Sequence, residues 1–423
     1  MSTRESEEQR VLATLDFLSR LAVSLLEAGF ATGMMLQTVS ACAAAMRLDG
    51  CTVTGMGRIV TLEYVGADDK PVTRTVVADT LDAFDCDRMK RLKDVAREVV
   101  VDGLDAGTAA GKLAAANRGP QPWPQWFVPI GGGLLALCIA VQVGGSAAAS
   151  VLAGVVFVVV NVTGLGLGRL LVPKLYAVAL QTLLAATFAG VLHGLGVLSV
   201  TEAAVLLATN AVLLVPMPQL VSTAIDAVNA DSLTALARAS SALLAIGGIA
   251  LGATGVLALS ERLSIGPPVD PQLPTLPIWL GIVFAILGSL CNAVLNRGGR
   301  DLLLPAAVAG LLTAAVNQTL LHAGNLSPVW STPLAAVVLG FASAAVSERL
   351  RLPISALALV GITGALLPGL TLYQGLISEL DGQSGGGYFG QVFAILIGIG
   401  VGVSLGILIY LLISRRPLVP SAE

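Results

Sequence analysis

Hydrophobic residues are distributed differently in two regions of the chain. Before residue 120 they recur with helical or strand periodicity among many charged residues, and after residue 127 they form long, nearly uncharged segments. About 20 consecutive apolar residues cross the hydrocarbon core of a bilayer. The second region therefore predicts about ten transmembrane helices, near residues 127–145, 150–168, 174–196, 201–228, 234–259, 277–296, 302–323, 331–347, 353–380 and 389–413.

The first region, residues 1–118, is predicted to be a small cytosolic α+β domain. Apolar positions three and four residues apart indicate helices, and alternating positions indicate strands. A linker rich in Gly, Pro and Trp follows at residues 119–126. The predicted elements are helices at 8–28, 87–102 and 105–117, a further helix capped by Thr32, and strands at 58–65 and 72–78.

Proline interrupts two of the long apolar segments at their centres. Segment 203–227 contains Pro216 and Pro218, and segment 354–380 contains Pro368, which lies 152 residues after Pro216. Proline removes a helical hydrogen bond, and a freed backbone group inside a bilayer needs a partner from protein or cavity water. A pair of interrupted helices in corresponding places indicates the binding site of a secondary transporter.

The membrane region divides into two halves, residues 127–262 and 277–416, joined by a Pro-rich extracytoplasmic linker at 263–276. Each half holds five predicted spans, an odd number, so the halves would insert in opposite orientations as inverted repeats. The predicted fold is thus an all-α polytopic membrane protein of two inverted five-helix repeats behind the cytosolic domain.

The distribution of positive charge gives the orientation. With the N-terminus inside, the outer loops hold only Arg262, and the inner loops hold nine basic residues. This asymmetry follows the positive-inside rule and predicts a multi-pass membrane protein with a cytoplasmic N-terminus. The nine are Arg169, Lys174, Arg238, Arg297, Arg300, Arg349, Arg351, Arg415 and Arg416.

Composition excludes several other classes of function. Only 12% of the 423 residues are charged and the net charge is −3, so no basic surface indicates nucleic acid. No His, Cys, Asp and Glu cluster has the spacing of metal ligands, and the five cysteines form no C-x-x-C motif. We therefore expect no enzyme activity, catalytic residue, cofactor or metal.

Short motifs in both regions resemble the bacterial threonine/serine exporter family. They are Leu25–Gly29, Arg58–Tyr64, Val215-Pro216, Asp226–Asp231, Leu367–Leu370 and Tyr373–Leu376. The resemblance implies export of small hydroxylated amino acids such as threonine and serine, driven by the proton motive force. Where the family commonly has Pro-Gly at the first break, this chain has Pro216-Met217-Pro218, which leaves the local backbone and the substrate preference open.

The substrate is predicted to bind at the two breaks. Exposed helix N–H groups attract a carboxylate and exposed carbonyls attract an ammonium group, so an amino acid would match both. Simple proline kinks, with the polar residues serving helix packing, are the alternative. The candidate binding residues are Asn210, Pro216, Met217, Pro218, Gln219, Ser222 and Thr223 around the first break and Pro368, Gly369, Thr371, Tyr373 and Gln374 around the second.

Two carboxylates are candidates for proton coupling. Asp226 follows the first break by ten residues and Glu379 follows the second by eleven. An ionisable residue inside a membrane indicates function, although either residue could also lie in solvent at the end of a span.

Besides a passive channel, whose flux would not depend on the proton gradient, the sequence leaves two other functions open. The first is export of a dicarboxylate such as succinate, against which the lack of deep Lys or Arg argues. The second is a membrane sensor that binds a ligand without transporting it. The expected partners are a small amino acid, protons and lipid, and the sequence does not decide whether copies associate.

Overall fold

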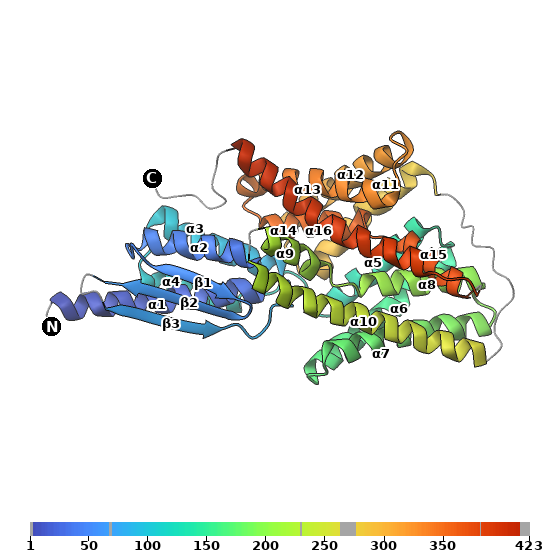
Figure 1. The fold of residues 1–423 in the computed structure, drawn as a ribbon, viewed down its shortest axis with the longest axis horizontal. Coiled ribbons are helices and arrows are strands. Elements are labelled where there is room, and N and C mark those ends of the chain that lie inside the picture. Colours follow the sequence, from blue (N-terminus) through green and yellow to red (C-terminus); the bar gives the residue numbers. More distant parts are fainter. Residues whose placement is uncertain (1–2, 67–69, 229–230, 263–275, 381, 415–423) are drawn as a thin grey trace.

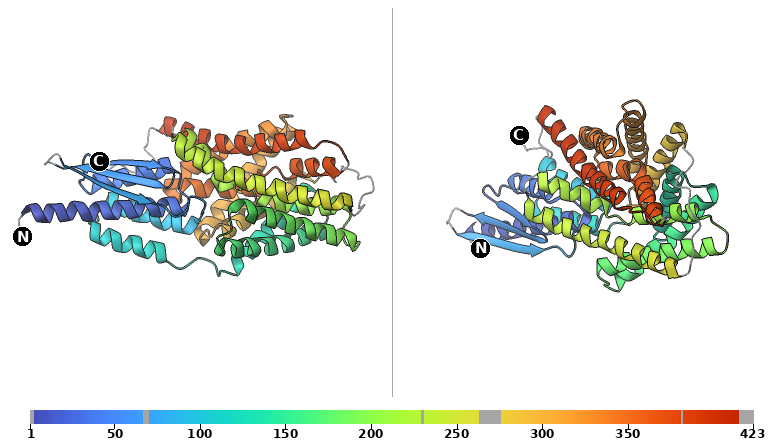
Figure 2. Two further views of the ribbon diagram at one scale, coloured as in Figure 1. Left: turned by 60° about the horizontal axis from the view of Figure 1, so that its bottom comes forward. Right: turned by 45° about the vertical axis from the view of Figure 1, so that its right-hand side comes forward.

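The computed structural model describes residues 3–66, 70–228, 231–262, 276–380 and 382–414. An N-terminal domain sits at one end of an elongated helical membrane domain (Figures 1 and 2). We call the end of the membrane domain that touches the N-terminal domain the near face, and the opposite end the far face. Of the predicted linker 263–276, all but residue 276 lies outside the described residues.

The N-terminal domain has four helices and a three-stranded antiparallel sheet in the order β1-β2-β3. Most of its elements were predicted, but β1 was missed because Gly55 interrupts its apolar alternation. The domain begins with α1 (Thr3–Ala28) and α2 (Thr32–Ala45). The strands are β1 (Thr52–Met56), β2 (Ile59–Val65) and β3 (Pro71–Val77), and α3 (Cys86–Asp102) and α4 (Ala106–Arg118) follow.

One continuous apolar core holds this domain together. Leu18 and Leu25 of α1 pack with Val60 and Leu62 of β2, and all four are fully buried. At the start of α3, the Asp85 carboxylate accepts the N–H of Arg88 over 2.9 Å and caps the helix. The helices therefore cover one face of the sheet around a core of the domain's own.

Helices occupy all ten predicted apolar segments. Within the described ranges, seven are long and apolar enough to cross a membrane, and two bent helix pairs would make nine spans. The tenth, α5, has 17 residues and is shorter than the predicted segment. The first half comprises α5 (Phe127–Val143), α6 (Ala147–Arg169), α7 (Lys174–Gly194), α8 (Val200–Leu213), α9 (Met217–Val228) and α10 (Ser232–Arg262). The second comprises α11 (Ile278–Leu295), α12 (Arg300–His322), α13 (Pro328–Leu350), α14 (Ile354–Ala365), α15 (Gly369–Leu380) and α16 (Gly386–Ser414).

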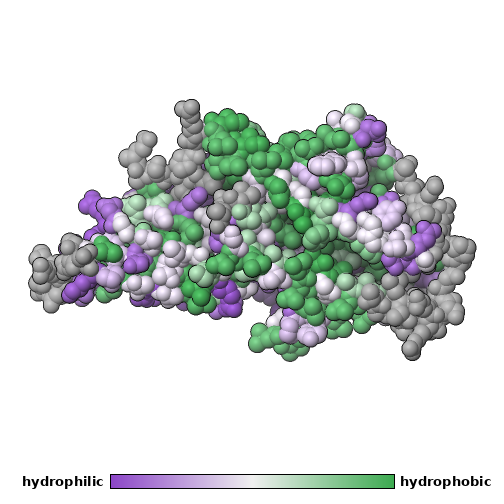
Figure 3. Space-filling view, in the orientation of Figure 1, coloured by the Kyte–Doolittle hydropathy of each residue, from purple (hydrophilic) through white to green (hydrophobic). Residues whose placement is uncertain are grey.

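The outer surface of these helices is apolar. Hydrophobic residues cover much of the membrane domain, whereas hydrophilic residues gather over the N-terminal domain (Figure 3). Large side chains such as Leu251 and Ile397 are about half exposed, at 56% and 47%. Exposed apolar area on this scale indicates contact with lipid.

The same helix pairs pack in both halves. α5 packs on α6, α6 on α7 and α7 on α10, as α11 packs on α12, α12 on α13 and α13 on α16. In both halves, two glycines four residues apart let the last helix approach its neighbour so closely that an added methyl group would collide with a backbone carbonyl. These close contacts are Gly248 with Leu175, Gly252 with Ala179, Gly402 with Pro333 and Gly406 with Val337.

The halves meet through α5 and α11 and through their bent helices. The thiols of Cys138 on α5 and Cys291 on α11 interact across this contact. α8 packs on α15, and α9 packs on α14 and α16. Both proline breaks therefore lie inside the membrane domain, between the halves.

Candidate functional site

The first break is a tight turn between α8 and α9, which meet at 43°. The N–H of Met217 donates to the carbonyl of Val215 over 2.8 Å, across Pro216. The N–H of Leu220 then donates to the carbonyl of Pro216 over 3.1 Å and starts α9. Because proline has no N–H, α8 cannot continue through this point.

The second break repeats this hydrogen bonding, with α14 and α15 at 45°. The N–H of Gly369 donates to the carbonyl of Leu367 over 2.8 Å, and the N–H of Leu372 donates to Pro368 over 3.0 Å. Each of these donor and acceptor residues lies 152 positions after the corresponding residue of the first break. In both breaks the first N–H of the new helix is satisfied within the turn, so this group is not left open for a ligand as the sequence suggested.

The prolines and the residues that follow them are buried where the halves meet. Pro216 and Pro368 are buried, and Met217 is 3% exposed. Gly369 lies so close to α5 that an added Cβ would be 2.9 Å from the Cγ2 of Val143. The second break thus has room only for glycine, and the first accommodates methionine.

A cavity of about 430 Å³ lies beside the first break and extends along α15 toward the far face. Its walls come from both halves and are almost entirely apolar, and among the described residues that line it Glu379 is the one that is charged. The lining residues are Leu207, Ala211, Val215, Ile246, Ile249, Ala250, Ala253, Leu372, Leu376, Glu379, Phe389, Val392, Phe393 and Leu396. Of the predicted site residues, only Glu379 lines this cavity.

The polar residues predicted around the first break face different neighbours. The amide nitrogen of Asn210 donates to the carbonyls of Leu206 and Ala153 over 2.9 and 3.3 Å, which ties α8 to α6. Among the described residues the side-chain oxygens of Asn210 and Thr223 have no hydrogen-bond partner. Ser222 is buried and Pro218 is half-buried. These residues do not form a single cluster.

Gln219 and Asp226 point toward the N-terminal domain rather than along the membrane domain. The amide of Gln219 donates to the carbonyl of Asp82 over 2.7 Å. The carboxylate of Asp226 accepts the N–H of Thr32 over 2.8 Å. The polar face of α9 is therefore part of the contact between the two domains.

Arg238 on α10 is a residue that sequence reasoning missed, because it was assigned to an inner loop. Its Nε lies 3.0 Å from Oδ2 of Asp226, and the two side chains are 1% and 0% exposed. The contact is electrostatic, since these two atoms are not aligned as a hydrogen bond. The sequence signal for this ion pair was that Asp226 and Arg238 carry opposite charges and lie on consecutive helices.

The second break has a different environment. Thr371 and Tyr373 are buried, and Gln374 is half-buried. Glu379 is exposed near the far face, and its Oε1 accepts the N–H of Gly385 over 2.7 Å. With a spacing of 152 residues, the counterpart of Asp226 is Ser378, so the two candidate carboxylates lie on different faces of their helices.

No group of three or more His, Cys, Asp or Glu residues within the described part of the chain could hold a metal ion.

Comparison with known proteins decides the family. A family model described as "Threonine/Serine exporter, ThrE" matches residues 281–410, and a second threonine/serine exporter model matches residues 16–260, more than half of the chain. The chain belongs to the threonine/serine exporter family. This agrees with the resemblance in its motifs, and it makes the chain a multi-pass transporter of the bacterial inner membrane.

Two curated relatives of this threonine/serine exporter family are similar over most of the chain. The "Probable threonine/serine exporter" of Mycobacterium tuberculosis is 26% identical over 86% of this chain and 69% of its own length. The "Threonine/serine exporter" of Corynebacterium glutamicum is 24% identical over 90% of this chain and 78% of its own length. No solved structure matches the chain.

Proposed function

We propose that this protein exports threonine and serine across the inner membrane by proton-coupled alternating access, with the substrate bound between the two proline breaks. The observation that carries the proposal is the identical backbone turn at Pro216 and Pro368, in helices that pack together where the halves meet. The names of the two relatives supply the substrate class. Discontinuous helices near the membrane centre are the usual place for substrate in such transporters.

An inverted repeat of two five-helix halves is part of the proposal. The shared helix pairs and the matching glycine contacts support it. The contact between Cys138 and Cys291 supports it independently, because these residues are 153 positions apart and equivalent residues meet only near a symmetry axis. Leu135 and Gly288, with the same spacing, also lie side by side, at 3.5 Å from the Leu135 methyl to a Cβ built on Gly288.

The proposed domains are the cytosolic domain 1–118, the linker 119–126, the repeats 127–262 and 277–416, and the extracytoplasmic linker 263–276. In this arrangement the near face is cytoplasmic. The excess of basic residues in the loops of that face supports this orientation.

An asymmetry between equivalent contacts supports alternating access. On the near side, α9 of the first half packs directly on α16 of the second. On the far side, the corresponding helices α15 and α10 both line the 430 Å³ cavity. The near side is thus closed and the far side hollow, as expected of an outward-facing state.

The proposed coupling groups are Asp226 and Glu379, one toward each face. Replacing Asp226 with Asn should reduce export driven by a pH gradient while the protein still inserts. Because the change also leaves Arg238 unpaired, Arg238→Gln in the Asp226→Asn background serves as the control. If pH-driven export in the Asp226→Asn variant equals wild type, Asp226 is not the coupling group.

The decisive experiment is uptake of labelled threonine into inside-out vesicles, with and without an imposed proton gradient that is acidic inside. Gradient-dependent accumulation that unlabelled serine competes away supports the proposal. Accumulation of succinate instead would favour the dicarboxylate exporter, and binding without flux would favour the sensor. Flux that ignores the gradient would remove proton coupling.

A further inference from the structure

The N-terminal domain is anchored to the first half by a buried ion pair. The loop between α1 and α2 closes over Asp226 and Arg238, whose side chains are 0% and 1% exposed. Nη2 of Arg238 donates to the carbonyl of Phe30 over 2.8 Å, and the N–H of Thr32 donates to Asp226 over 2.8 Å. Separating this contact would leave a charge in apolar surroundings without its partners, which is costly.

Further contacts between the N-terminal domain and helices α9 and α10 strengthen this anchor. The carboxylate of Asp82 accepts the hydroxyl of Ser241 over 2.8 and 2.9 Å, and the carbonyl of the same residue accepts the amide of Gln219. The N–H of Gly57 donates to the hydroxyl of Thr234 over 3.0 Å. The first half is thus held by several short bonds, of which those of Gln219 and Thr234 are partly buried and those of Ser241 are exposed.

The polar contacts with the second half centre on partly exposed ion pairs, beside apolar packing of Ala31 and Cys86. Lys93 on α3 lies 2.8 Å from Glu348, and their side chains are 22% and 49% exposed. Lys90 forms a similar pair with Asp301 at the start of α12. Exposed ion pairs contribute little to stability and are screened by salt. Among the described residues this side has no fully buried ion pair like that of Asp226 and Arg238, so its polar contacts are the weaker ones.

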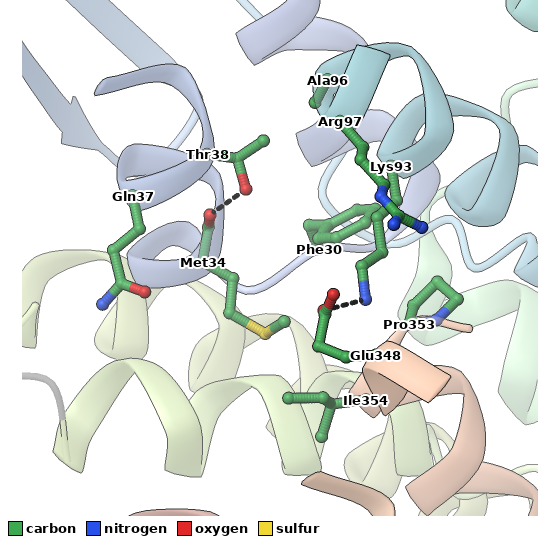
Figure 4. A pocket seen from close by; sticks show the side chains of 10 residues that line it. All are labelled: Phe30, Met34, Gln37, Thr38, Lys93, Ala96, Arg97, Glu348, Pro353 and Ile354. Carbon is green, nitrogen blue, oxygen red and sulfur yellow. Dashed lines mark hydrogen bonds and ion pairs between the residues drawn. The ribbon is translucent and has the colours of Figure 1, made fainter. Parts of the chain in front are cut away.

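A small cavity of about 40 Å³ lies in the same part of the interface. In Figure 4, Lys93 reaches across it from α3 to Glu348, while Met34 of α2 and Ile354 of α14 lie at its edge. The nearby N–H of Cys86 donates to the carbonyl of Asn296 over 3.0 Å, and the Cys86 side chain is 3% exposed. The packing against the second half is thus incomplete at this cavity, whereas the Cys86 thiol, which does not line it, is buried in the apolar cluster that also contains Leu302.

We propose that the N-terminal domain is a clamp that stays anchored on α9 and α10 and releases α12 to α14 when the near face opens. The proposal rests on alternating access as proposed above. Opening the near face requires the halves to separate there, and a domain bound to both prevents this. The weaker, salt-sensitive contact is the one that must break.

Cross-links that fix one contact at a time test the clamp. Asp82→Cys with Ser241→Cys ties the domain to the first half, and Lys93→Cys with Glu348→Cys ties it to the second. Both pairs are introduced into a variant whose five native cysteines have been replaced and that still exports threonine. Each pair is then bridged with a short, cleavable bis-maleimide. The single-cysteine variants treated in the same way control for the substitutions.

The second-half link should reduce threonine export at least tenfold, with recovery when the bridge is cleaved. The first-half link should leave threonine export within twofold of that of its single-cysteine controls treated with the same reagent. Equal export with both links, or equal loss with both, overturns the proposal.

A second readout does not depend on transport, so it separates failure of the clamp from failure of the exporter. Burial raises the pKa of the Cys86 thiol and keeps it unreactive while the clamp is closed. In a variant with Cys86 as its only cysteine, Lys90→Ala with Lys93→Ala should raise the rate of maleimide labelling several-fold. Lys112→Ala, which removes an exposed ion pair within the domain, is the matched control. Equal labelling rates in these variants would contradict a releasable second-half contact.

Discussion

The two proline breaks have the same backbone turn, but the residues that surround each turn differ. The first break leads into α9, whose polar residues bind the N-terminal domain and the buried Arg238. The second leads into α15, which lines the apolar cavity and ends at the exposed Glu379. Proline and the next residues determine the turn locally, whereas the role of each half-helix depends on what packs against it. Four predictions test this difference, in order of decreasing effect.

The largest effect is expected at the buried pair of the first half. Arg238→Gln leaves Asp226 charged and unpaired, which should cost about 3–5 kcal/mol in the free energy of unfolding. Thermal unfolding in detergent measures the loss. Adding Asp226→Asn should recover most of it, whereas Glu379→Gln, at the exposed position of the second half, should change stability by less than about 0.5 kcal/mol. A double variant no more stable than Arg238→Gln alone would mean that the pair itself is not what stabilises α9.

The second prediction exchanges the residues that follow the two prolines. Gly369→Met would force a side chain against Val143 and should cost about 1–3 kcal/mol by overpacking. Met217→Gly should cost less than a typical core deletion, because the turn itself tolerates glycine at the equivalent position. Unfolding and the initial rate of threonine transport measure both variants. Equal losses would show that the two breaks are surrounded alike.

The third prediction removes the turns. Pro216→Ala and Pro368→Ala each allow a helix to straighten, so each should weaken threonine binding by roughly tenfold, or about 1.4 kcal/mol. Equilibrium binding to the purified protein gives the two affinities. Wild-type affinity in both variants would exclude the breaks as the substrate site, and a loss in only one would locate the site at that break.

The smallest effect is expected at the exposed contact with the second half. Lys90→Ala removes the ion pair with Asp301 and should change stability by about 0–1 kcal/mol, with less difference at high salt. Thermal unfolding at low and high ionic strength checks this. A loss of more than about 2 kcal/mol in stability would mean that this ion pair contributes as a buried pair does, and not as an exposed one.

Much of the fold could be predicted because its signals are local. Apolar segment lengths gave the positions of the membrane helices, and proline spacing gave two equivalent turns. The environments of Gln219 and Arg238 could not be predicted, because they depend on a domain whose contacting residues lie more than 130 positions away in the chain. β1 was missed for a local reason, since its alternation is weak and it is recognisable mainly through its pairing with β2.

Gly29 connects this interface to the order in which the protein is made. Its φ of +109° and its close approach to Ala83 shape the loop that carries Phe30 and Thr32. Every residue that forms this loop leaves the ribosome before α9 and α10 do. The surface of the N-terminal domain that contacts α9 and α10 can therefore be folded before those helices are synthesised. The groups that bind Arg238 are then already in place.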